Sequence, residues 1–141
     1  MKLYNVLILL ASVFFTMQVF AAASDLYTYN DDILPLFQDQ GCTDCHSWTG
    51  NYSELIAKTS ESTSPAGSPV VKPNDASGSV LVWRLKGETS TGTTVSRMPL
   101  GGDPLSEEAI LRAVKWIDAG APEIAVTVKV TTWGKLKSLF R

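Results

Sequence analysis

Both cysteines and the single histidine of this 141-residue chain lie in five consecutive residues, Cys42-Thr43-Asp44-Cys45-His46. Two cysteines cannot staple a small domain through several disulfides. One histidine also excludes metal sites that are built from several imidazoles. The chain must therefore fold around an apolar core, and its content of 45% hydrophobic residues is sufficient for one.

The spacing C-x-x-C-H has a specific chemical use. Two thiols at this spacing can add to the two vinyl groups of a haem and form thioethers, and the adjacent imidazole can then bind the iron as an axial ligand. A covalent tether removes the need for a deep pocket, which suits a small domain. The motif therefore predicts one covalently attached haem c, held by Cys42 and Cys45, with His46 as an iron ligand.

Three other uses of the two cysteines are open at this point. A redox disulfide in a thioredoxin-like domain needs strands that alternate with helices, and no strand pattern precedes the motif. Half of a zinc site needs further ligands, and the chain has no other Cys or His to complete a set of four. A structural disulfide between residues three apart would close a small, strained ring.

Residues 1–23, MKLYNVLILLASVFFTMQVFAAA, have the pattern of a secretory signal peptide. Lys2 gives the positive start, an apolar run extends from Val6 to Phe20, and three alanines offer a cleavage site. This run is short for a membrane span, which needs roughly 20 residues, so an uncleaved N-terminal anchor is the alternative. We expect a periplasmic or secreted protein, which agrees with haem attachment because c-type haem is attached outside the cytoplasm.

The second axial ligand is predicted from a count of methionines. Met1 and Met17 lie in the signal segment, so the mature chain keeps Met98 alone. A His and Met pair is a standard axial set in cytochromes c and raises the reduction potential. Because Met98 lies among the turn residues of Arg97–Gly102 and not in a helical stripe, we expect it to bind iron rather than to pack. The alternative is an iron with an open distal position.

Residues 24–123 are predicted to form one small all-α domain, with long Gly/Ser/Pro-rich loops around the covalently bound haem. Four helices are expected, over 31–42, over 53–58, from a cap at Asp75 or Ser77 through Leu85, and over Ser106–Ala119. Gly41 and Gly120 suit the ends of the first and last helices. The last helix carries one apolar face, formed by Ile110, Ala113, Val114 and Ile117.

With these features in this order, the sequence resembles the class I c-type cytochromes, and in detail the small bacterial domains of the planctomycete-type cytochrome group. The resemblance covers residues 28–122. Around C-x-x-C-H, its specific part, the matching segments are Leu34-Pro35-Leu36, Ser79-Val80-Leu81 with Arg84-Leu85, Met98-Pro99, and Trp116-Ile117 with Gly120-Ala121-Pro122.

The resemblance implies a helical electron carrier in which Cys42 and Cys45 hold the haem, His46 is the proximal ligand and Met98 is the distal ligand. It also implies that Trp83 and Arg84 pack on the haem or approach a propionate. The alternatives are core packing for the tryptophan and a solvated helix charge for the arginine.

Charge divides the chain into an acidic body and a basic tail. All 14 acidic residues precede residues 124–141, whose charges are Lys129, Lys135, Lys137 and Arg141. A net charge of -2 without a basic stripe excludes a nucleic-acid partner. We expect charge-steered docking to redox partner proteins in the periplasm or at the membrane. We expect an extended arm from 125. We expect residues 127–141 to pack on their own domain, and the alternative is that they contact a membrane surface or a partner.

The sequence favours an electron carrier over an enzyme. With both axial positions filled, no substrate reaches the iron, and the protein would only cycle between Fe(III) and Fe(II). The alternative is a haem-based enzyme or gas sensor, which requires an open distal site and therefore that Met98 is a bystander. A catalytic distal pocket normally offers polar donors, and the chain has no second histidine for that role.

Overall fold

The computed structural model describes residues 26–61 and 66–125. Within these ranges the chain forms helices and no strand, with two isolated β-bridges, Thr59–Pro69 and Glu88–Thr94. The all-α prediction is therefore confirmed for this part of the chain. The predictions for the signal segment 1–23 and for the arm and tail beyond 125 lie outside the described residues. None of the described helices combines the length and the apolar composition that crossing a bilayer requires.

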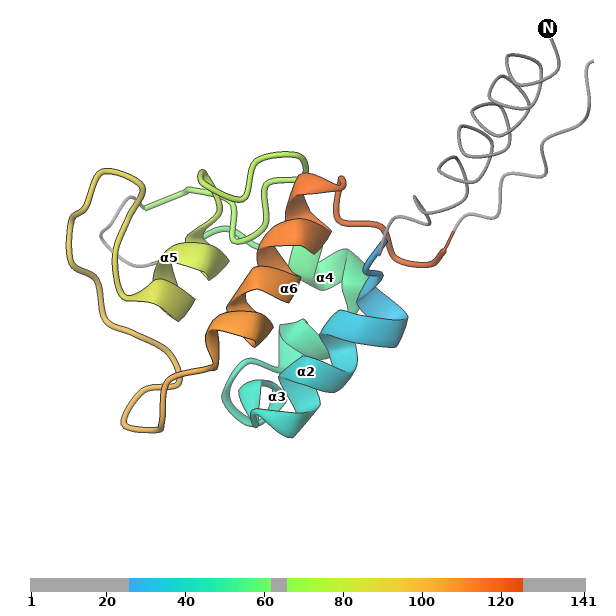
Figure 1. Ribbon diagram of the computed structural model, residues 1–141, viewed down its shortest axis with the longest axis horizontal. Coiled ribbons are helices and arrows are strands. Elements are labelled where there is room, and N and C mark those ends of the chain that lie inside the picture. Colours follow the sequence, from blue (N-terminus) through green and yellow to red (C-terminus); the bar gives the residue numbers. More distant parts are fainter. Residues whose placement is uncertain (1–25, 62–65, 126–141) are drawn as a thin grey trace, which may run out of the picture.

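The elements follow one another in a simple order. They are a π-helical turn η1 (Tyr29–Ile33), α2 (Leu34–Asp39), α3 (Cys42–Cys45), a 3-10 turn η2 (Ser47–Gly50), α4 (Tyr52–Ala57), α5 (Val80–Lys86) and α6 (Glu107–Asp118). Figure 1 shows α6 in the middle of the molecule, with α5 on one side and α2 and α4 on the other. Long loops connect α4 to α5 and α5 to α6, as predicted.

The first predicted helix, 31–42, is wrong at both ends. It begins earlier, as η1, because the Thr28 hydroxyl accepts a hydrogen bond from the Asp31 N–H (3.2 Å) while the Thr28 N–H donates to the Asp32 carboxylate (2.7 Å). It ends at Asp39, since Gly41 takes the left-handed conformation (φ +66°) and separates α2 from α3. The motif therefore starts a helical turn of its own.

The last helix agrees with its prediction. The Ser106 hydroxyl accepts from the Ala109 N–H (3.2 Å), and Gly120 follows the helix with φ +94°. The buried residues of α6 are Ile110, Ala113, Trp116 and Ile117, and Val114 is half-buried. The indole of Trp116 is fully buried and donates to the Pro122 carbonyl (3.0 Å), which fixes the chain after the helix.

The core has two parts, and α6 belongs to both. The larger part gathers residues of η1, α2, α4, α5 and α6 around Tyr29, Phe37, Leu55, Trp116 and Ile117. The smaller part joins α2, α5 and α6 through Leu36, Leu85, Leu105, Ile110 and Ala113. Because the same helix packs in both clusters, it fixes α5 relative to α2, and these two elements line the site described below.

The approach to α5 differs from the prediction of a cap at Asp75 or Ser77. The helix begins after Ser79, whose buried hydroxyl donates to the Asp75 carbonyl (2.9 Å) and accepts from the Lys72 N–H (2.9 Å). Asp75 instead holds the preceding turn, since its carboxylate accepts from the Gly78 N–H (2.8 Å) and pairs with the Lys72 ammonium (2.7 Å). The predicted 53–58 helix is α4, capped by Asn51.

This turn gives the fold a pH dependence. The Lys72 ammonium first, and then the Ser77 hydroxyl and the Gly78 N–H, lower the pKa of Asp75 to about 2. A carboxyl with a lowered pKa stabilises the fold above its unfolded value, and this contribution is lost as the pH falls through the folded value. We expect Asp75→Asn to be less stable than wild type at pH 5, and the difference to close between the usual aspartate value of 3.8 and about 2. Urea unfolding at stepped pH measures the difference, and a gap that stays constant over this range would contradict the expectation.

Candidate functional site

A cavity of about 510 Å³ opens beside the end of α3. Its volume lies in the range of about 300–1,000 Å³ that is typical of small-molecule and cofactor pockets. The lining is mainly apolar, and its members from the helices and the two loops include Phe37, Cys42, His46, Trp48, Val80, Leu81, Leu85, Met98 and Leu100. Among the described residues, α6 contributes no lining side chain. The cavity therefore brings together three of the four predicted site residues.

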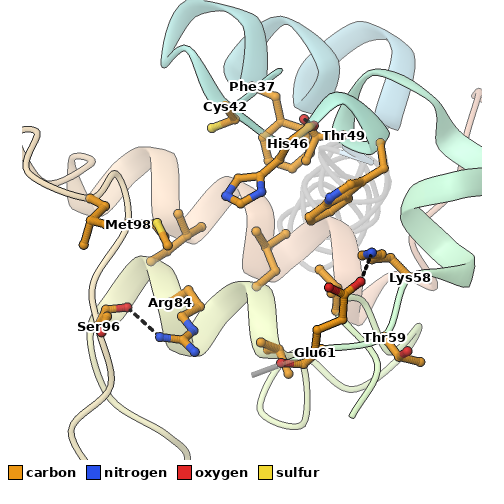
Figure 2. A pocket seen from close by; sticks show the side chains of 17 residues that line it. Phe37, Cys42, His46, Thr49, Lys58, Thr59, Glu61, Arg84, Ser96 and Met98 are labelled. Atoms are coloured by element: carbon orange, nitrogen blue, oxygen red, sulfur yellow. Dashed lines mark hydrogen bonds and ion pairs between the residues drawn. The ribbon is translucent and has the colours of Figure 1, made fainter. Parts of the chain in front are cut away.

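His46 has a backbone that is fixed from both sides. Its N–H donates to the Cys42 carbonyl (2.9 Å), and its own carbonyl accepts from the N–H (2.8 Å) and the hydroxyl (2.7 Å) of the buried Thr49. Thr49 is held in turn, because its carbonyl accepts from the hydroxyl of Tyr29 (2.7 Å). Figure 2 shows the imidazole projecting into the cavity. It makes no hydrogen bond within the described ranges, so one ring nitrogen is available to bind a metal and the other to donate its N–H to an orienting partner.

The two cysteines occupy different surroundings although they share one helical turn. Cys42 is half-buried and lines the cavity, whereas Cys45 is exposed and does not. Burial raises the pKa of the Cys42 thiol. Both thiols are free, and their i, i+3 spacing makes them neighbours on the helix surface. The pair therefore lies at the edge of the cavity, with one sulfur inside and one at the surface.

Met98 reaches the same cavity from the loop between α5 and α6. Its N–H donates to the Arg84 carbonyl (2.8 Å), and the neighbouring Arg97 side chain donates through Nε to the Leu85 carbonyl (3.1 Å). These two bonds fasten the loop to the C-terminal turn of α5. Figure 2 places Met98 and Lys58 to either side of the His46 ring in this view. The only methionine outside the predicted signal segment is thus held at the cavity by the main chain.

The two residues that the resemblance placed near the haem behave differently. Trp83 is not among the residues that line the cavity, and its buried indole donates to the Ser77 carbonyl (2.6 Å), which supports the alternative of core packing. Arg84 does line the cavity, and its guanidinium donates to the Ser96 carbonyl (3.2 Å). It is therefore more than a solvated helix charge.

Trp48, Lys58 and Glu61 are among the lining residues that were not foreseen from the sequence. The Trp48 ring lies 5.3 Å from the His46 ring between centroids, and the Lys58 ammonium lies 5.8 Å from the Trp48 ring centroid. The ammonium also pairs with the Glu61 carboxylate (2.6 Å) and lowers its pKa. The only local sign in the sequence is that Trp48 follows the histidine by two residues.

The alternatives for the cysteines can be compared with this geometry. A thioredoxin-like domain needs strands, and the described residues contain none. No group of three or more His, Cys, Asp or Glu side chains within 26–61 and 66–125 is placed to hold a metal ion. A haem needs less from the protein, because the porphyrin itself supplies four nitrogens and only axial ligands remain to be provided. An apolar cavity with an imidazole, a methionine and two adjacent thiols fits this requirement.

Comparisons with models of known protein families, with curated proteins and with solved structures found no match. What the site can do therefore follows from its own residues and their geometry.

Proposed function

We propose that this protein is an exported monohaem c-type cytochrome that carries electrons between redox partner proteins. The observation that carries the proposal is that Cys42, His46 and Met98, which are 56 positions apart at their extremes in a chain with one histidine, line one apolar cavity. A cavity that was only a packing defect would not be expected to gather them.

Each side chain has a role in this proposal. Cys42 and Cys45 would hold the haem through thioethers, and His46 and Met98 would be the ligands that the protein offers to its iron. The bound haem would supply a one-electron couple between Fe(III) and Fe(II). The apolar walls, among them Phe37, would exclude water and so favour the less charged, reduced state. With both axial positions filled, the protein would act as an electron-transfer protein and not as an enzyme.

The wider organisation belongs to the same proposal. Residues 1–23 would be removed as a signal peptide, 24–123 would form a cytochrome c-like domain around the covalently bound haem, and 124–141 would remain as a basic tail. The mature protein would be periplasmic or secreted, and its acidic body would meet redox partners that present basic surfaces. Residues 127–141 would pack on this domain, with contact to a membrane or a partner as the alternative.

The deciding experiment expresses the full chain in a host that matures c-type cytochromes. The intact mass of the purified protein should equal the sequence without 1–23 plus one haem, and the denatured protein should stain for haem peroxidase activity on a gel. A mass that equals the polypeptide alone, together with a blank stain, would refute the proposal. The same mass spectrum reports cleavage of the signal segment separately from haem attachment, because each changes the mass by a different amount.

A further inference from the structure

Two oppositely charged side chains and a tryptophan line the same cavity and have no role in the proposed haem attachment. They are Lys58, Glu61 and Trp48, and we call them the Lys58 cluster. The Trp48 ring lies close to both other groups: its centroid is 5.3 Å from that of the His46 ring and 5.8 Å from the Lys58 ammonium. One positive charge is therefore positioned a single aromatic ring away from the predicted iron ligand.

The two charges of the cluster differ in their contact with solvent. The Lys58 side chain is 31% exposed, whereas the Glu61 side chain is 83% exposed. Water and salt screen an exposed charge much more strongly than a partly buried one. The positive member should therefore act on the cavity more strongly than the carboxylate that is paired with it.

We propose that Lys58 raises the reduction potential of the centre that His46 would bind, and that Glu61 offsets a part of this effect. The inference rests on the proposed function and deepens it. Reduction takes one electron from a redox partner protein and removes one unit of positive charge from the site. A fixed ammonium nearby disfavours the more positive, oxidised state and so favours reduction.

The size of the effect follows from Coulomb's law. A unit charge on the order of 10 Å away, at an effective dielectric constant near 20, changes such an equilibrium by about tenfold. For a one-electron couple a tenfold change corresponds to about 59 mV. Arg84 also lines the cavity, but its charge is the same in all the variants below and cancels in the comparison.

The test is a potentiometric titration of the haem-loaded protein at low ionic strength. Lys58→Gln should lower the equilibrium constant for reduction about tenfold, whereas Lys58→Arg, which keeps the charge, should leave it within about twofold. Glu61→Gln should shift it in the opposite direction, upward by about twofold to threefold, and this shift should fade as salt is added.

The Lys72–Asp75 pair provides a matched control. It has the same i, i+3 spacing and a similar separation (2.7 Å), but neither residue lines this cavity. Lys72→Gln should therefore leave the potential unchanged, and a shift as large as that of Lys58→Gln would show a general effect of net charge and overturn the inference. No shift in Lys58→Gln, or an equal shift in Lys58→Arg, would overturn it as well.

If Lys58→Gln does not accumulate as haem-loaded protein, Glu61→Gln is the deciding variant, because an exposed side chain can be replaced without disturbing the fold. A rise in its reduction potential supports the inference, and no rise overturns it. Wild-type protein without covalent haem would refute the proposed function and this inference together. If the wild type carries covalent haem and neither Lys58→Gln nor Glu61→Gln changes the reduction potential, this inference alone is refuted.

Discussion

The double variant Cys42→Ser, Cys45→Ser is expected to carry no covalently attached haem in a host in which the wild type is fully loaded. A serine hydroxyl does not form the thioether that a cysteine thiol forms with a vinyl group, and the chain has no further cysteine to replace either residue. The haem stain of the denatured variant should fall to background, and its intact mass should be that of the polypeptide. Each single variant keeps one thiol and should keep a reduced stain.

The matched control for this experiment is Asp44→Asn. Asp44 lies between the cysteines on the same helical turn, and it is exposed and does not line the cavity. The substitution keeps the shape of the side chain and leaves both thiols in place, so the haem stain should equal that of wild type. A stain that survives denaturation in the double variant would contradict thioether attachment through these residues.

The second large effect is expected at position 98. Met98→Leu keeps the approximate volume of the side chain and removes the sulfur, so it tests ligation with little disturbance of packing. The oxidised variant should lose the weak far-red absorption band that marks methionine ligation. The reduced variant should bind carbon monoxide readily, because its distal position is open. Its equilibrium constant for reduction should fall by more than about tenfold, since a methionine ligand raises the potential.

Met98→His separates the loss of methionine from the loss of a ligand. The imidazole offers a new donor from the same backbone position, so the far-red band should be absent while carbon monoxide remains excluded. Ready binding of carbon monoxide by the reduced wild type, with no change in Met98→Leu, would contradict methionine ligation. That outcome would favour a haem-based enzyme or gas sensor instead.

The parts of the fold that the sequence predicted well depend on local signals. α6 was placed within a residue of its observed bounds because Ser106 caps it and a glycine follows it. The start of the first helix was missed because Thr28, and not the Asn/Asp run that follows it, caps the helix. The Thr28 hydroxyl accepts from the Asp31 N–H, and the Thr28 N–H donates to the Asp32 carboxylate. The start of α5 was missed because the Ser79 hydroxyl is engaged by residues of the preceding loop.

The candidate site also has parts that the sequence predicts and parts that it does not. C-x-x-C-H and the single remaining methionine could be identified by spacing and by counting, without knowledge of the fold. The Lys58 cluster could not, because nothing local places an ammonium from the end of α4 over Trp48 beside the histidine. The orientation of Trp83 away from the cavity was also unpredictable, since it depends on the Ser77 carbonyl reached after the chain turns.

The central helix α6 joins both halves of the core and yet contributes no described side chain to the cavity wall. Phe37 and Leu85 belong both to the core and to the cavity wall, whereas the buried residues of α6 belong to the core alone. A protein engineer can use the solvent-facing positions of that helix, such as the half-exposed Leu111, to tether the molecule to an electrode. Such a tether would leave the chemical surroundings of the imidazole unaltered.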